Sequence, residues 1–180
     1  MMLFTNRTNT KSGRPDIRSS FMAWVKAVRL QFHPMGFLAY WLGCAAALET
    51  GTPFHSTIFW LGYGTVFLIE VGSVLFNEIY DQETDRLNTN RSPFSGGSGV
   101  LVEGNLKPGA VRLAAWGCMA AALGLCIIAV FTPSAPPGWM VGIYLALGFI
   151  LGPGYTTPPL KLSSRGFGEL NVGITHSLYL

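Results

Sequence analysis

Side chains that carry oxygen ligands recur at every fourth position near the middle of the sequence, at Asn77, Asp81 and Asp85. On an α-helix, successive members of such a series are offset by about 40° around the axis and about 6 Å along it, so they form one stripe. Carboxylates stacked in this way repel each other, and a hard cation with oxygen ligands offsets that repulsion. Mg2+ binds one or two carboxylates and completes its shell with water and phosphate oxygens. The spacing therefore predicts a magnesium site made by these three residues.

Two further polar residues extend this stripe toward the preceding apolar segment. Ser73 lies four residues before Asn77, and Glu70 lies seven residues before it. An ionisable group at membrane depth is costly, so Glu70 indicates a polar cavity, with Ser73 beside it. Acidic residues four apart also occur on ordinary solvated helix ends, and the stripe by itself leaves both interpretations open.

The segment that follows the stripe, residues 86–109, is polar and rich in glycine, and it contains Arg91. Glycines let the backbone approach a phosphate group and point N–H groups at it. Arginine binds phosphate oxygens in a bidentate manner. Beside a magnesium site, this composition predicts diphosphate binding; taken alone, it is also typical of a flexible loop.

A second polar segment, residues 156–168, carries Lys161 and Arg165. Both cations could contact the same diphosphate from the opposite side, or they could serve only to fix the orientation of the chain in a membrane. The sequence assigns no catalytic role to the histidines, which are His33, His55 and His176.

The elements that must position these residues are apolar helices. The chain has 49% hydrophobic and only 12% charged residues, whereas soluble domains contain about 25% charged residues. A spanning helix needs about 20 mainly apolar residues. Such segments lie at residues 30–48, 56–80, 113–131 and 139–155, with a partial one at 170–180. The sequence thus predicts an all-α, polytopic transmembrane helical bundle, embedded in the lipid bilayer.

The cations are sorted along the chain. All 12 Lys and Arg residues lie before the first span, between the second and third, or between the fourth and fifth. The connections at 49–55 and 132–138 contain none. The positive-inside rule then predicts a cytoplasmic N-terminus, with a basic cytoplasmic tail at 1–28. The Ser/Thr-rich, basic start of this tail is also compatible with a transit peptide.

Two classes of function are disfavoured by composition. The net charge of +3 is too small to predict a nucleic-acid partner. The three cysteines, Cys44, Cys118 and Cys126, lie in apolar segments without a Cys/His cluster, so they are expected to be small buried hydrophobes rather than zinc ligands.

Three motifs resemble the UbiA prenyltransferase superfamily. The series Asn77-x3-Asp81-x3-Asp85 is similar to its first aspartate-rich motif. The runs Ser-Gly-Gly-Ser-Gly-Val-Leu-Val-Glu-Gly (95–104) and Tyr-Thr-Thr-Pro-Pro-Leu-Lys-Leu...Arg-Gly-Phe-Gly-Glu (155–169) look most like the 1,4-dihydroxy-2-naphthoate prenyltransferase branch. The resemblance covers the chain from about residue 29 onward. It implies that residues 29–180 form the N-terminal four to five helices of a nine-helix ring around a central cavity.

The resemblance also implies an activity. A prenyl group would pass from a polyprenyl diphosphate to an aromatic acceptor in quinone biosynthesis, in the menaquinone pathway, in a bacterial or archaeal cell membrane. Mg2+ would be held by Asn77, Asp81 and Asp85, of which the two aspartates would be catalytic. Arg91 and Lys161 would be basic contacts to the diphosphate.

The family's second aspartate motif belongs to later helices, which lie beyond residue 180. We therefore expect one magnesium half-site, little or no activity from these residues alone, and association with a complementary half or a second copy. Other acceptors stay open within the superfamily: 4-hydroxybenzoate, a tocopherol precursor, chlorophyllide, haem or a glycerol phosphate lipid. The alternatives outside it are a small cation transporter subunit, whose path would be lined by Glu70 and the stripe, and a non-catalytic membrane fragment.

Overall fold

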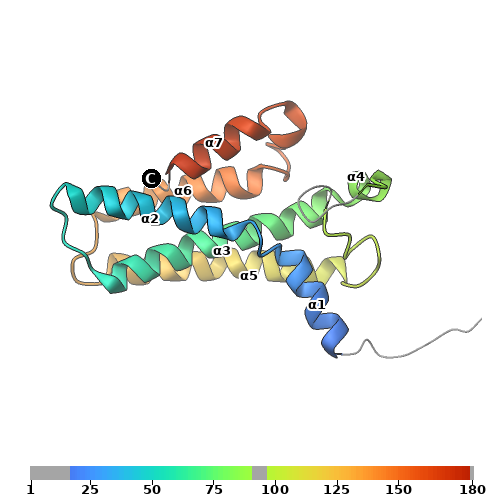
Figure 1. The fold of residues 1–180 in the computed structure, drawn as a ribbon, viewed down its shortest axis with the longest axis horizontal. Helices are drawn as coiled ribbons and strands as arrows, with labels where there is room; N and C mark the ends of the chain where they lie inside the picture. Colours follow the sequence, from blue (N-terminus) through green and yellow to red (C-terminus); the bar gives the residue numbers. More distant parts are fainter. Residues whose placement is uncertain (1–16, 91–96, 179–180) are drawn as a thin grey trace, which may run out of the picture.

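The computed structural model describes residues 17–90 and 97–178, and the regular elements within these residues are all helices (Figure 1). The all-α fold is thereby confirmed. The elements are α1 Ile17–Val28, α2 His33–Glu49, α3 Ser56–Tyr80, α4 Gln82–Leu87, α5 Pro108–Val130, α6 Gly138–Gly154, the short 3-10 helix η1 Ser163–Arg165, and α7 Gly168–Leu178.

The long helices run antiparallel to their neighbours in sequence, because short connections join them at one end of the bundle. These connections, 50–55 and 131–137, lie together on the left of Figure 1, and the polar segments lie at the right-hand end. Helix α3 is central: it packs along α5 and also contacts α1, α2 and α6, while α7 packs on α6 and α2. The stripe therefore lies at the end of the most enclosed helix.

Small residues allow α3 and α5 to approach closely, as is common between helices in membranes. A Cβ at Gly72 would lie 3.2 Å from the carbonyl oxygen of Ala115. On either side of this contact, Leu75 of α3 and Met119 of α5 are almost fully buried. Close packing of these two helices holds the end of α3 in place.

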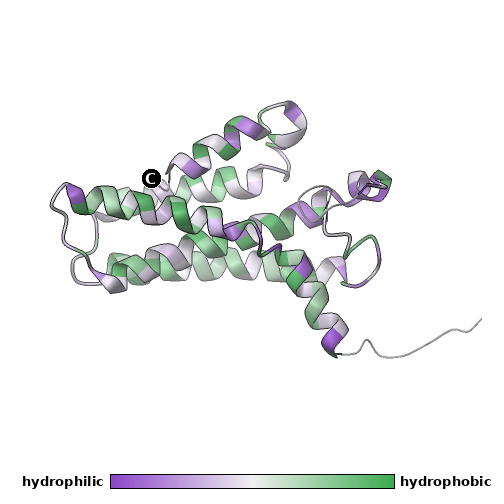
Figure 2. Cartoon of the chain, in the orientation of Figure 1, coloured by the Kyte–Doolittle hydropathy of each residue, from purple (hydrophilic) through white to green (hydrophobic). Residues whose placement is uncertain are grey.

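The long helices are built mainly from apolar residues (Figure 2), and many of their large apolar side chains are exposed. Leu113 is 76% exposed and Phe131 is 84% exposed, both on or directly after α5. Helices α3 and α5 are long and apolar enough to cross a membrane, and α6 is apolar but has 17 residues. Large exposed apolar surfaces of this kind are unusual in water and favourable in lipid.

The helices depart from the expected segments at three polar borders. Residues 17–28, within the segment expected to be a tail, form α1, whose Ala23 and Ala27 are buried in the core. Arg29 has a φ of 51° and separates α1 from α2. Helix α5 begins at Pro108, five residues before the apolar segment expected at 113–131. Proline is favourable in the first turn of a helix, so the helix can start there.

Candidate functional site

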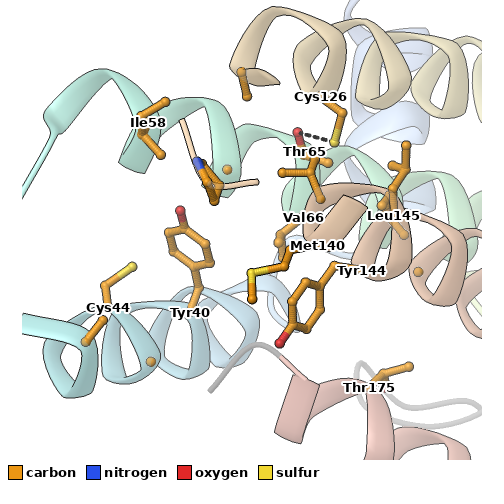
Figure 3. Close-up of a pocket in the computed structure, with 18 residues that line it drawn as sticks. Tyr40, Cys44, Ile58, Thr65, Val66, Cys126, Met140, Tyr144, Leu145 and Thr175 are labelled. Carbon is orange, nitrogen blue, oxygen red and sulfur yellow. Dashed lines mark hydrogen bonds between the residues drawn. The ribbon is translucent and has the colours of Figure 1, made fainter. Parts of the chain in front are cut away.

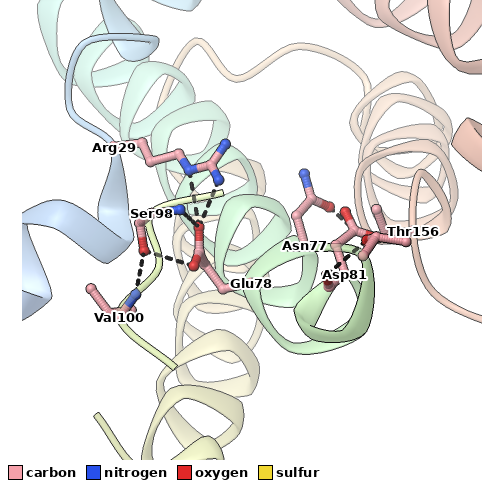
Figure 4. Close-up of polar contacts among 8 residues, drawn as sticks. Arg29, Asn77, Glu78, Asp81, Ser98, Val100 and Thr156 are labelled. Carbon is pink, nitrogen blue, oxygen red and sulfur yellow. Dashed lines mark hydrogen bonds and ion pairs between the residues drawn. The ribbon is translucent and has the colours of Figure 1, made fainter. Parts of the chain in front are cut away.

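Helix α3 ends at Tyr80, and the chain bends at Asp81 before α4 begins. Helical hydrogen bonding nevertheless continues through the bend: the Asp81 N–H donates to the Asn77 carbonyl (2.9 Å), and the Asp85 N–H donates to the Asp81 carbonyl (2.8 Å). Figure 4 shows Asn77 and Asp81 on one side of the helix end and Glu78 on the other. The polar stripe therefore lies on a helix end that bends, not on a straight helix.

Asn77 connects the stripe to the polar segment after α6. Thr156 is 3% exposed, and its hydroxyl donates to Asn77 Oδ1 at 2.7 Å (Figure 4). An amide oxygen has two lone pairs. One lone pair of Oδ1 thus remains for a second donor or a cation.

Asp81 is partly buried beside a second carboxylate. Burial raises the pKa of the Asp81 carboxyl to about 6, and the negative charge of Asp85 contributes to the rise. The positive charges of Arg29 and Lys161 lower the same pKa. The charge of Asp85 thus disfavours the ionised form of Asp81. A divalent cation bound between the two carboxylates would stabilise their charged forms.

Asp85 lies beneath the glycine-rich segment. Its side chain is buried, and its carboxylate lies directly against Gly97, where an added Cβ would overlap both carboxylate oxygens. Gly97 also has a φ of 65°, a conformation that glycine adopts without steric cost. This close approach requires glycine at position 97 for two separate reasons.

Glu78 joins three distant segments, a role that the sequence analysis missed. One carboxylate oxygen, Oε1, accepts from Arg29 Nε at 3.0 Å and lies 2.8 Å from its Nη2. The Ser98 backbone N–H also donates to Oε1 (2.9 Å), and the Ser98 hydroxyl donates to Oε2 (2.7 Å). Glu78 is 2% exposed. Its carboxylate fixes the α1–α2 junction and the start of the segment after residue 96 onto the end of α3 (Figure 4).

Replacing Glu78 by alanine is expected to destabilise the fold by about 3–5 kcal/mol, because Arg29 would lose its partner in a buried ion pair. Thermal unfolding followed by circular dichroism in nanodiscs measures the effect. Glu83→Ala on α4 is the control, since Glu83 is exposed and its removal should shift the melting temperature little. Equal melting temperatures for the two variants would show that the buried pair contributes nothing.

A pocket of about 460 Å³ lies beside the stripe, between α2, α3, α6 and α7. Its polar lining includes Glu70, Ser73 and Asn77, which follow one another along α3, and also Arg29. Ser73 Oγ donates to the Ile69 carbonyl at 2.7 Å and lies against Gly152 of α6. The pocket therefore begins at Asn77, in the last turn of α3, and extends along α3 toward Ile69.

Glu70 pairs with His33, a residue to which the sequence analysis assigned no role. His33 Nδ1 lies 3.2 Å from Glu70 Oε2, and His33 Nε2 lies 3.0 Å from the Val28 carbonyl. Since a carbonyl only accepts, Nε2 is the donor there, and Nδ1 faces the Glu70 carboxyl group. Gly36, without a side chain, leaves the space that the Glu70 carboxylate occupies. Both polar groups are thereby satisfied inside the bundle.

A second pocket, of about 480 Å³ and mainly apolar, adjoins the first and shares Ile69 and Thr175 with it. Its walls come from α2, α3, α5 and α6, and Figure 3 shows Tyr40 and Tyr144 on opposite helices at its sides. The Tyr40 hydroxyl donates to the Phe59 carbonyl at 2.9 Å, so its polar end is satisfied. The two pockets thus adjoin each other, and the first contains Glu70, Ser73 and Asn77.

Of the three basic residues predicted to contact the diphosphate, the structure places Lys161 near Asp81. Lys161 is exposed but close enough to influence Asp81, and Arg165 is exposed in η1. Arg91 lies outside the described residues. Within residues 17–90 and 97–178, no group of three His, Cys, Asp or Glu side chains could hold a metal by itself. A metal site here would need the Asn77 oxygen and oxygens from a ligand.

The comparisons with known proteins give one match. The model of the UbiA prenyltransferase family matches residues 36–179. The chain belongs to this family. No curated protein and no solved structure matched significantly. Membership of the UbiA family implies an integral membrane protein and prenyl transfer to aromatic acceptors. UbiA enzymes generally use Mg2+, and the oxygen donors at the bend of α3 are of the type that Mg2+ prefers.

Proposed function

We propose that this protein binds a polyprenyl diphosphate through Mg2+ and transfers the prenyl group to an aromatic acceptor of the 1,4-dihydroxy-2-naphthoate type, in menaquinone biosynthesis. The observation that carries the proposal is the end of α3, where Asn77 borders a pocket that Arg29 also lines, and where Asp81 lies beside Asp85 and within electrostatic reach of Arg29 and Lys161. The motifs around residues 95–104 and 155–169 support this branch of the family.

The metal ligands in this proposal are Asn77, Asp81 and Asp85. Their donor chemistry fits, because two carboxylates and one amide oxygen leave further positions for water and phosphate oxygens. When bound, Mg2+ would neutralise the charge that develops on the departing diphosphate.

The chain's own cations would support the same diphosphate. Arg29 and Lys161 both act electrostatically on Asp81, so they lie near the proposed anion. Arg91 and Arg165 are proposed as additional contacts, since arginine binds phosphate oxygens in a bidentate manner. The backbone at Gly97 passes close to Asp85 and would border the diphosphate.

The transfer breaks the bond between C1 of the prenyl group and the diphosphate oxygen, and the electron pair leaves with the diphosphate. An electron-rich ring carbon of the acceptor forms the new carbon–carbon bond to C1 and then loses its proton to water. Preorganised positive groups stabilise the leaving anion, and apolar walls limit attack by water on the allylic cation. The mainly apolar pocket of Figure 3 adjoins the pocket that Asn77 lines and would accommodate the prenyl tail.

The proposed site faces the cytoplasm in a multi-pass arrangement with a cytoplasmic N-terminus. The polar connections that follow α3 and α6 lie at one end of the bundle (Figure 1) and contain Arg86, Lys107 and Lys161, whereas 50–55 and 131–137 at the other end contain no Lys or Arg. We propose a bacterial or archaeal cell membrane, and residues 29–180 as the first four to five helices of a nine-helix ring.

Binding of geranyl diphosphate to the purified protein in nanodiscs tests the proposal, with isothermal titration calorimetry as the measurement. We expect binding with Mg2+ present and its loss when EDTA removes the divalent ion. Affinity that is the same with and without Mg2+ would overturn the proposal. Cation flux through reconstituted vesicles, without any diphosphate binding, would instead indicate the transporter interpretation.

A further inference from the structure

Helix α1 carries three rows of side chains, each made by residues four apart along the helix. One row, with Ala23 and Ala27, is buried in the core, where α1 packs on α3. The other two rows lie about 100° and 160° around the helix axis from this buried row. The bundle therefore covers one side of α1, and the remaining two rows point away from it.

The first of these outward rows is apolar and contains Ile17, Phe21 and Val25. Ile17 is 86% exposed and Phe21 is 64% exposed, so the described chain leaves both side chains largely uncovered. An aliphatic and an aromatic side chain exposed side by side are unfavourable in water. This row therefore calls for an apolar partner.

The second outward row is cationic and contains Arg18 and Lys26, with Met22 between them, and all three are exposed. Positive charge is concentrated in this part of the sequence. Residues 1–30 contain six Lys and Arg residues and one acidic residue, which gives +5, whereas residues 31–180 contain six and eight, which gives −2. Such a separation of charge favours an anionic partner for α1.

The position of α1 indicates which partner is both apolar and anionic. Helix α1 directly precedes α2 and lies at the end of the bundle where the polar segments are (Figure 1). There α3 and α5, which are long and apolar enough to cross a membrane, reach the aqueous side. Helices with Lys or Arg on one face and apolar side chains on the other bind at the boundary between acyl chains and headgroups. Anionic headgroups attract such cations.

We propose that α1 lies in the headgroup region of the membrane, where Ile17 and Phe21 contact acyl chains and the cationic row of Arg18 and Lys26 binds anionic phospholipids. A second copy of the chain is disfavoured as the partner, because it would bring two segments of charge +5 together. The inference concerns the membrane surface and does not depend on the proposed prenyl transfer.

Photo-crosslinking from the apolar row tests this proposal on the full chain. Phe21→p-benzoylphenylalanine places a photoreactive ketone on that row, and the protein is reconstituted in liposomes with equal amounts of phosphatidylcholine and phosphatidylglycerol. Mass spectrometry after irradiation identifies what has been joined to the protein. We expect lipid adducts in which phosphatidylglycerol is about fivefold more abundant than phosphatidylcholine, as one cation near anionic headgroups predicts.

Three further variants serve as comparisons. Ser19→p-benzoylphenylalanine is on the same helix, about 160° around the axis from position 21, and should give far fewer lipid adducts. Arg18→Gln combined with Lys26→Gln should bring the ratio of the two lipids at position 21 toward one. Arg86→Gln combined with Lys107→Gln removes the same charge from exposed positions on other segments and should leave that ratio unchanged.

The crosslinked products decide between the possible partners. Adducts rich in phosphatidylglycerol at position 21, with an enrichment that depends on Arg18 and Lys26, support the proposal. A dimer joined through position 21 would overturn it, because a second copy would then cover the apolar row. Equal lipid adducts from positions 19 and 21, or no preference for phosphatidylglycerol, would also overturn it. The same holds if both pairs of charge substitutions reduce the preference equally, since net charge rather than α1 would then attract the lipid.

Discussion

Asp81→Asn is expected to weaken Mg2+-dependent binding of geranyl diphosphate by on the order of 100-fold, since even groups behind a metal ligand affect metal affinity by about 10–100-fold. The substitution keeps the size of the side chain and removes its charge. Asp81 is the partly buried carboxylate on which Asp85, Arg29 and Lys161 all act. Calorimetric titration in nanodiscs at fixed Mg2+ concentration measures the change.

The control for this substitution is Glu83→Gln. Glu83 lies two residues further on and is exposed on α4, so the same change of charge occurs near the site without removing a proposed ligand. We expect its affinity for geranyl diphosphate to be within about twofold of the unmodified protein, because exposed charges interact weakly through water. Equal losses in both variants would mean that general charge, and not a ligand, determines binding.

Gly97→Ala is expected to have the second large effect, on the fold and on Mg2+-dependent binding together. The new methyl group would occupy the position of the Asp85 carboxylate and would force that carboxylate or the chain at residue 97 to move. The backbone conformation at φ 65° adds a cost of about 1–2 kcal/mol for any residue with a Cβ. Ser98, held by Glu78, restrains the neighbouring backbone.

Gly104→Ala isolates the steric part of that effect. Gly104 has a φ of 72°, close to that of Gly97, but nothing lies within 4 Å of an added Cβ. Both variants should lose similar stability from the backbone, whereas only Gly97→Ala should also lose affinity for geranyl diphosphate in the presence of Mg2+. Melting temperatures and calorimetric affinities measured on both variants make the comparison. Unchanged affinity in Gly97→Ala would show that the position of Asp85 does not matter for binding.

These predictions concern one arrangement, in which three separate segments meet at the bend of α3. The α1–α2 junction contributes Arg29, the glycine-rich segment contributes Ser98 and Gly97, and the segment after α6 contributes Thr156. Arg29 and Ser98 both contact Glu78, Gly97 lies against Asp85, and Thr156 contacts Asn77. Displacing any one of these segments therefore changes the surroundings of the stripe.

The sequence by itself determined the helical class and the position of the stripe. Long apolar runs interrupted by glycine and proline define helices in lipid, because backbone polar groups there must be satisfied within each segment. The four-residue spacing of Asn77, Asp81 and Asp85 is a local property of one chain segment, and the backbone hydrogen bonds retain it through the bend. The family resemblance likewise came from contiguous motifs, and the family match over residues 36–179 confirms it.

Only the tertiary structure decided which polar residues meet. Glu78 and Arg29 are 49 positions apart, and Glu70 and His33 are 37 apart, so no periodicity along the chain could pair them. The hydrogen bond from Asn171 of α7 to the Leu151 carbonyl of α6 is equally invisible in sequence, because it depends on how these two helices pack. Spacing along one helix follows from its geometry, whereas contacts between helices follow from which small residues let them approach.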